Sequence, residues 1–172
     1  MSPADPARLV AEIEALGTSA LPYPRLHREL TARIRRCFPV DAACWHGLDP
    51  ETRLLTTADP VELLDHGFLT PETEGSAAHA VVASEYQRDD VNQFASLAER
   101  RMPVGILSET TRGRPERSAR YREFLEPIGT PYEMRVAMVT RGRVWGCVVL
   151  HRTKDTGDFR PEDARLMARL SR

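Results

Sequence analysis

The chain has 172 residues, 41% of them hydrophobic and 28% charged, which is the composition of one ordinary globular domain with a sizeable core. Its 24 lysines and arginines nearly balance 25 aspartates and glutamates, so the formal net charge of −1 excludes the strongly basic character of a nucleic-acid-binding domain. No apolar run approaches the ~20 residues that span a bilayer, and the N-terminus lacks the apolar segment of a secretory signal. We therefore expect a cytoplasmic protein without membrane contact.

Three cysteines and five histidines are the candidate metal and redox residues. Cys37, Cys44 and Cys147 are odd in number and have no C-x-x-C spacing, which argues against a disulfide framework or a cysteine zinc site. No two histidines lie four residues apart on a predicted helix, and neither a G-x-S-x-G elbow nor a P-loop occurs. We expect no metal, no cofactor and no catalysis, with the cysteines buried as small hydrophobic residues.

The N-terminal region predicts two helices. Asp5 and Pro6 are a typical helix start, with an acceptor at the N-cap and a proline at the first helical position. The apolar stripe of this helix consists of Leu9, Ile13 and Leu16. A second stripe indicates a helix over residues 24–37. We expect residues 1–20 to form an N-terminal helix whose stripe suits a dimer contact.

A first hairpin follows these helices. Residues 41–48 are typical of a buried strand and residues 54–58 of its return, with turn-forming residues between them. Residues 60–75 mix proline, glycine, aspartate and threonine with short apolar pieces. This composition predicts a loop containing at most a short helix.

Two further helices are predicted in the middle of the chain. Asp90, with Gln93 three residues later, forms a capping-box pattern for a helix that extends to about Arg101. Residues 115–125 predict a second helix, with Tyr121, Phe124 and Leu125 as its apolar side.

The best-defined unit is a hairpin of residues 132–140 and 143–151, joined by Arg141 and Gly142. A two-residue turn fixes which residues share each face of this hairpin. One face carries Val144, Gly146, Val148 and Leu150, which lie opposite Val139, Ala137, Arg135 and Glu133 respectively. The other face carries Trp145, Cys147, Val149 and His151, which lie opposite Met138, Val136, Met134 and Tyr132 respectively. Because both faces are mostly apolar, both must be covered. We expect an α+β fold with an antiparallel sheet sandwiched by helices.

A last helix begins at Pro161, with acidic residues in its first turn. Its apolar stripe consists of Leu166, Met167 and Leu170. The helix pattern reaches Arg172 without a C-cap, glycine or proline. We expect it to continue toward a further domain.

The C-terminal residues carry a family resemblance. Residues 143–151, RVWGCVVLH, resemble the last strand of a GAF domain, and residues 158–163, DFRPED, resemble the F-[ST]-P-x-D entry to its last helix, with Arg160 where Ser or Thr is usual. The resemblance covers roughly residues 22–170. It implies a GAF-like (PAS/profilin-like) fold, with residues 21–172 forming one sensor domain.

A narrower resemblance concerns residues 103–109, PVGILSE, residues 115–122, PERSARYR, and the Trp-Gly strand. These segments are similar to the N-terminal sensor segment of actinobacterial LuxR-type regulators, in which a helix-turn-helix domain follows the GAF domain. The resemblance implies a transcriptional regulator that contacts DNA only through a C-terminal domain absent from this chain.

Arg135 is the most informative candidate ligand-binding residue, because a charge in mid-strand among small apolar residues needs a partner. Glu133, on the same predicted face, would provide a structural ion pair. Alternatively, the planar guanidinium anchors a carboxylate or phosphate of a ligand. Both interpretations stay open. Aromatic residues that would line a cavity, if they are not simply core, are Trp45, Tyr86, Phe94, Tyr132 and Trp145, with Tyr121 beside Phe94.

Seven arginines lie between residues 100 and 122, against only two glutamates. Such a run usually forms a solvated surface. It could also gather anionic ligands or contact an output domain.

Taken together, these features predict a cytoplasmic, homodimeric, non-catalytic domain that senses an unknown small molecule on behalf of a LuxR-like regulator. A ligand-free dimerisation or scaffold module is the alternative. A GAF-type redox enzyme is a third hypothesis, which would require a reactive thiol.

Overall fold

The computed structural model describes residues 6–171. In the helix that begins at Pro6, the side chains are described from Arg8 onward. The strands are β1 Ala42–Leu48, β2 Leu55–Asp59, β3 Val104–Ile106, β4 Tyr132–Thr140 and β5 Arg143–Arg152. The helices are α1 Pro6–Gly17, α2 Tyr23–Arg35, α3 Val61–Asp65, α4 Pro71–Tyr86, α5 Phe94–Ala98, α6 Leu107–Thr110 and α7 Pro161–Leu170, with a 3₁₀ turn η1 Pro115–Arg117 and a π-helical turn η2 Tyr121–Leu125.

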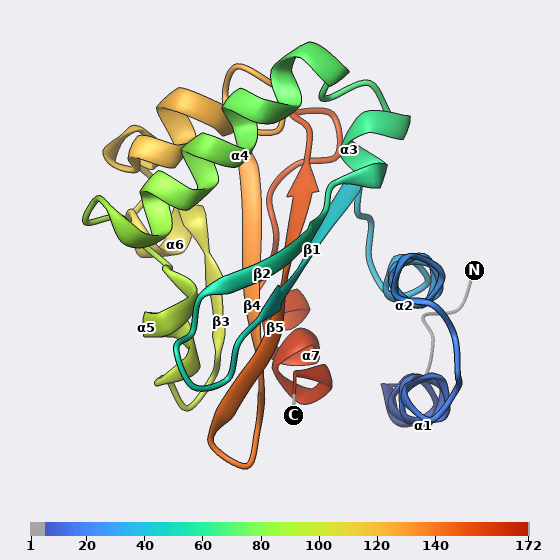
Figure 1. Cartoon of the computed structure of the whole chain (residues 1–172). Helices are drawn as coiled ribbons and strands as arrows, with labels where there is room; N and C mark the ends of the chain where they lie inside the picture. The colour runs from blue at the N-terminus through green and yellow to red at the C-terminus, as the bar shows by residue number, and fades with distance from the viewer. Residues whose placement is uncertain (1–5, 172) are drawn as a thin grey trace.

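All five strands form one antiparallel sheet in the order β2-β1-β5-β4-β3 (Figure 1). One face packs against α3, α4, α5, α6 and η2, and the other against α2 and α7. Two separate apolar clusters result, one on each side of the sheet. The predicted α+β sandwich is confirmed. Helix α1 packs beside α2 and α7, and Leu9 is buried there, while Ile13 and Leu16 are half-buried.

Helix α4 is the main element that the sequence reading did not predict. Residues 60–75 were expected to form a loop with a short helix. They contain the short helix α3 and also the beginning of α4, a helix of 16 residues. The residues that α4 buries are small, namely Ala77, Ala83 and Ser84. A helix that packs through small side chains shows no stripe of large apolar residues, so its periodicity is weak.

The expected capping box at residue 90 is wrong. Helix α5 begins only at Phe94, and the Gln93 side chain donates instead to the carbonyl oxygens of Ser84 and Arg88, both at 2.9 Å. The Asp90 carboxylate accepts from Ser118 Oγ at 3.1 Å and from the Arg120 backbone N–H at 2.9 Å. Both side chains therefore connect distant segments rather than cap a helix.

The single helix expected over residues 115–125 is also wrong. Ser118 has an extended ψ of 129° and separates η1 from η2. The proposed Asp5 cap of α1 lies outside the described residues.

The C-terminal hairpin forms as predicted, but its register shifts by one residue. Val139 pairs with Val144, whereas Met138 pairs with Gly146, so Trp145 is the extra residue of a β-bulge. Beyond this bulge Arg135 lies opposite Val149, not Val148, and the face assignments predicted for β5 are reversed. Trp145 is consequently 55% exposed.

Two glycines offer a test of this packing. A Cβ at Gly105 in β3 would collide with the buried Asn92 side chain, whereas a Cβ at Gly75 in α4 would meet open space. We expect Gly105→Ala to lower the free energy of unfolding by about 1–3 kcal/mol through overpacking. Gly75→Ala should raise it by about 0.5–1 kcal/mol because alanine favours the helix. Urea denaturation measures both, and equal effects of the two substitutions would contradict the packing described.

Candidate functional site

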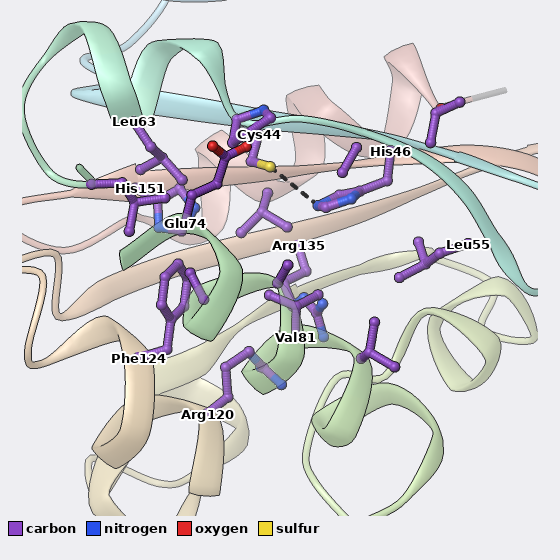
Figure 2. A pocket seen from close by; sticks show the side chains of 18 of the residues that line it. Cys44, His46, Leu55, Leu63, Glu74, Val81, Arg120, Phe124, Arg135 and His151 are labelled. Atoms are coloured by element: carbon purple, nitrogen blue, oxygen red, sulfur yellow. Dashed lines mark hydrogen bonds between the residues drawn. The ribbon is translucent and has the colours of Figure 1, made fainter. Parts of the chain in front are cut away.

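A cavity of about 270 Å³ lies between the sheet and the helices α4 and η2. Its size falls near the lower end of ligand pockets, and its lining is mainly apolar. The exposed lining residues Thr56, Thr57 and Val82 place its opening between β2 and α4. Figure 2 shows Leu63, Val81 and Phe124 around the cavity together with the polar side chains Arg120, Arg135 and His46.

Strand periodicity places the polar groups on this face. Side chains two residues apart in a strand point to the same side of the sheet. The cavity-lining pairs are Cys44 and His46 in β1, Glu133 and Arg135 in β4, and Val149 and His151 in β5. The central strands therefore put ionisable side chains on a face that is otherwise apolar.

Glu133 is at the centre of a buried ion network. The Arg120 side chain binds it through two nitrogens, with Nε 2.9 Å from Oε1 and Nη2 2.8 Å from Oε2. Arg120 Nη1 also lies 3.7 Å from Asp90 Oδ2. All three side chains are 1% exposed. Burial favours the neutral acid, but Arg120 and Arg135 outweigh this effect and hold the pKa of Glu133 below its usual 4.5.

Arg135 is held by a different carboxylate. Its Nη1 lies 2.5 Å from Glu85 Oε1 and 3.1 Å from the Asn92 carbonyl oxygen, and its guanidinium carbon lies 3.8 Å from the centre of the Phe94 ring. Its Nε is 3.8 Å from Glu133 Oε1, too far for a hydrogen bond. Its Nη2 meets no acceptor from any residue between 6 and 171. A buried guanidinium with a free donor therefore forms part of the cavity wall.

Two histidines and a cysteine of the lining are uncharged at neutral pH. Burial, with Arg135 adding to it, lowers the pKa of His46 to about 3, and burial lowers the pKa of His151 to about 4. Cys44 Sγ lies 3.3 Å from His46 Nε2, but burial raises the pKa of its thiol to about 12. The reactive form of cysteine is the thiolate, so this pair lacks an activated nucleophile.

Of the six residues predicted to bind a ligand, only Arg135 lines the cavity. Phe94 lies beneath its guanidinium. Tyr121 packs against the apolar cluster on the cavity side, and Trp45 and Tyr132 belong to the cluster on the opposite face. Trp145 is exposed at the bulge. Tyr86 lies at the end of α4, where its hydroxyl accepts from the Leu55 N–H at 2.7 Å.

Arg120 and Glu85 are the main site residues that sequence reasoning missed. Arg120 belongs to the arginine-rich stretch that was interpreted as surface, yet it is 2% exposed. Glu85 lies in α4 and joins Arg135 across 50 positions of sequence. No local pattern marks either residue, because only the fold brings their charges to the sheet.

Removing one partner of the buried network tests its role in stability. Arg120→Met leaves the carboxylates of Glu133 and Asp90 buried without their counter-ion, and we expect it to lower the free energy of unfolding by about 3–5 kcal/mol. Arg36→Met removes a surface ion pair with Glu12 and should have little effect. Urea denaturation compares the two, and similar losses would refute the central position of Arg120.

The neutral histidines predict a pH dependence. Below pH 6.5 the unfolded chain protonates His46 and His151 while the folded chain does not, so the unfolded state binds more protons. The free energy of unfolding should fall as the pH drops below 6.5, with a slope that approaches about 1.4 kcal/mol per pH unit for each histidine near pH 5.

Denaturant titrations at pH 7, 6 and 5 measure this slope. We expect His46→Gln to reduce it by roughly half of the histidine contribution. His79→Gln, at an exposed position of α4, should leave it unchanged. A slope that His46→Gln does not alter would show that His46 is not buried in its neutral form.

Comparison with known proteins places this arrangement in a family. No curated protein matches the chain significantly. Among solved structures, the GAF domain of an Acinetobacter phosphoenolpyruvate-protein phosphotransferase is similar, with a TM-score of 0.52 and 18% identity over 96% of this chain and 85% of that chain. The family model of the GAF domain matches residues 25–172. The chain therefore belongs to the GAF domain family, a common sensory and regulatory module.

Proposed function

We propose that this chain is a non-catalytic regulatory domain that binds a small molecule in the cavity beneath α4. The observation that carries the proposal is that Arg135, whose Nη2 is buried without an acceptor among the described residues, lines a mainly apolar cavity. A buried charged donor without an acceptor is costly, and a ligand oxygen would remove that cost. Apolar walls with a few polar anchors are typical of small-molecule sites.

The contacts of β1 offer a route by which occupancy would reach the opposite face. Cys44 and His46 line the cavity, while Trp45 between them points to the other side of the sheet. Trp45 Nε1 donates to Thr31 Oγ1 of α2 at 2.9 Å, and its ring stacks on His27 at 5.1 Å. A ligand that shifts β1 would therefore move α2, which packs against α1.

Helix α4, which covers the cavity, and the residues just after it contact β2 and η2. Tyr86 joins the end of α4 to β2, and Arg88, just after α4, forms an ion pair with Glu123 of η2. Apart from Glu85, α4 is held to the sheet by small buried side chains, so a ligand that contacts this helix would change these contacts.

Within a larger protein, we propose that the domain is the cytoplasmic sensor segment of a LuxR-like transcriptional regulator and that it forms a homodimer. The support is the similarity of residues 103–109 and 115–122 to such sensor segments. The half-buried apolar residues Leu16, Leu166 and Leu170 would supply part of a dimer contact. DNA binding would then belong to a separate C-terminal domain.

The test is a thermal-shift screen of the 172-residue chain against a broad set of small metabolites. A ligand at 100 times its Kd stabilises the folded state by about 2.7 kcal/mol, which corresponds to roughly 5–10 °C in Tm for a chain of this size. Arg135→Lys should reduce the affinity for such a ligand at least about tenfold, because lysine lacks the planar pair of donors.

Arg143→Lys, at an exposed position of β5, is the matched control and should leave the affinity unchanged. If no compound stabilises the parent chain, the domain is better described as a ligand-free dimerisation or scaffold module. If native-state thiol labelling modifies Cys44 rapidly, the redox alternative gains support.

A further inference from the structure

We infer that the ligand of this cavity is an uncharged, mainly apolar molecule with a hydrogen-bond acceptor such as an amide or ketone oxygen, rather than a carboxylate or phosphate. This inference rests on the proposed function and specifies its ligand class. Its starting point is that the charge of Arg135 is already balanced by Glu85, with Glu133 at a longer distance.

The balance of charge around the cavity disfavours an anion. The guanidinium groups of Arg120 and Arg135 face the carboxylates of Glu85, Asp90 and Glu133, which leaves one formal negative charge in excess. These side chains are between 1% and 3% exposed, so water screens them little. An anionic ligand would have to lose its hydration without gaining an unpaired positive charge.

Other ionisable groups do not reverse this balance. His46 and His151 are neutral at pH 7 and contribute no positive charge. Glu74, half-buried in α4, also lines the cavity. Figure 2 shows Glu74 among the labelled side chains around the cavity. An incoming anion would therefore meet a further carboxylate.

The guanidinium groups nevertheless retain free donors. Arg135 Nη2 and Nε and Arg120 Nη1 have no hydrogen-bond acceptor within the described part of the chain, although Nε and Nη1 lie 3.8 and 3.7 Å from carboxylate oxygens. Such donors suit a neutral oxygen, which accepts a hydrogen bond without adding charge. His46, which also lines the cavity, likewise has a buried Nδ1 without a hydrogen-bond partner among the described residues.

The remaining lining specifies the body of the ligand. Leu63, Leu69, Val81, Phe124 and Val149 supply aliphatic and aromatic contacts around the polar groups. A compact hydrocarbon or aromatic body with one carbonyl group would satisfy both the apolar wall and the free donors.

Two probes of the same shape test the charge preference, namely 4-fluorobenzamide and 4-fluorobenzoate. Fluorine NMR line broadening on the whole 172-residue chain at pH 7 gives a Kd for each probe. We expect the amide to bind at least about tenfold more tightly than the benzoate, and Arg135→Lys to weaken the amide by a similar factor.

Charge-removing variants sharpen the test. Glu74→Gln and Glu85→Gln should each lower the ratio of the benzoate Kd to the amide Kd at least about threefold, because each removes a negative charge beside the cavity. Glu74 is half-exposed, so Glu74→Gln remains informative if Glu85→Gln fails to fold. Glu109→Gln, an exposed residue of α6, is the control and should change neither affinity.

The outcomes separate this inference from the function beneath it. Benzoate binding as tight as amide binding would overturn the neutral-ligand inference and leave small-molecule binding standing. Failure of both probes to bind would overturn the inference. The proposed function would fail as well only if the metabolite screen also found no ligand.

Discussion

The carboxylate of Glu133 is buried near the start of β4, and its ionised state depends on Arg120, which directly precedes η2, and on Arg135 from the same strand. This requirement joins elements that the chain order separates. Arg120 must reach the sheet from the position just before the π-helical turn, and Arg135 must bind Glu85 on α4. The charges therefore specify how the helices of one face are placed over the sheet, whereas the apolar clusters supply most of the driving force for burial.

The same network gives the cavity its chemical character. A solid apolar core would need no donors, and a site for an anion would have an excess of positive charge. Here the buried carboxylates outnumber the guanidinium groups by one, yet Nη2 and Nε of Arg135 and Nη1 of Arg120 have no hydrogen-bond acceptor among the described residues. The opposite face of the sheet shows the contrasting case, where Arg152 donates to Pro39 and Asp158 carbonyl oxygens and to Asp163. These hydrogen bonds join the end of β5 to Pro39, to Asp158 and to the first turn of α7.

The elements whose stability comes from local patterns could be predicted from sequence. The two hairpins, the terminal helices and the α+β class follow from periodicity and turn residues. Helix α4 could not be predicted from periodicity because it buries alanine and serine instead of large apolar side chains. One extra residue in a β-bulge exposes Trp145 and determines which side chains of β5 point to each side of the sheet. The two-residue turn in the sequence does not indicate this bulge. Arg135 could be singled out as a charge in an apolar strand, but its partner Glu85 and its neighbour Arg120 come from non-local packing that periodicity cannot encode.

The buried ion network is tested most directly by the rate at which arginine Nε protons exchange with solvent, measured by ¹⁵N NMR on the uniformly labelled chain. Burial of Arg120, Arg135 and Arg152 predicts three Nε–H signals that exchange far more slowly than those of surface arginines, and Arg120→Lys and Arg135→Lys should each remove one of them. Rapid exchange of the Arg120 and Arg135 Nε–H protons would mean that solvent reaches the network. It would contradict the buried ion network on which both the fold of this face and the proposed ligand site depend.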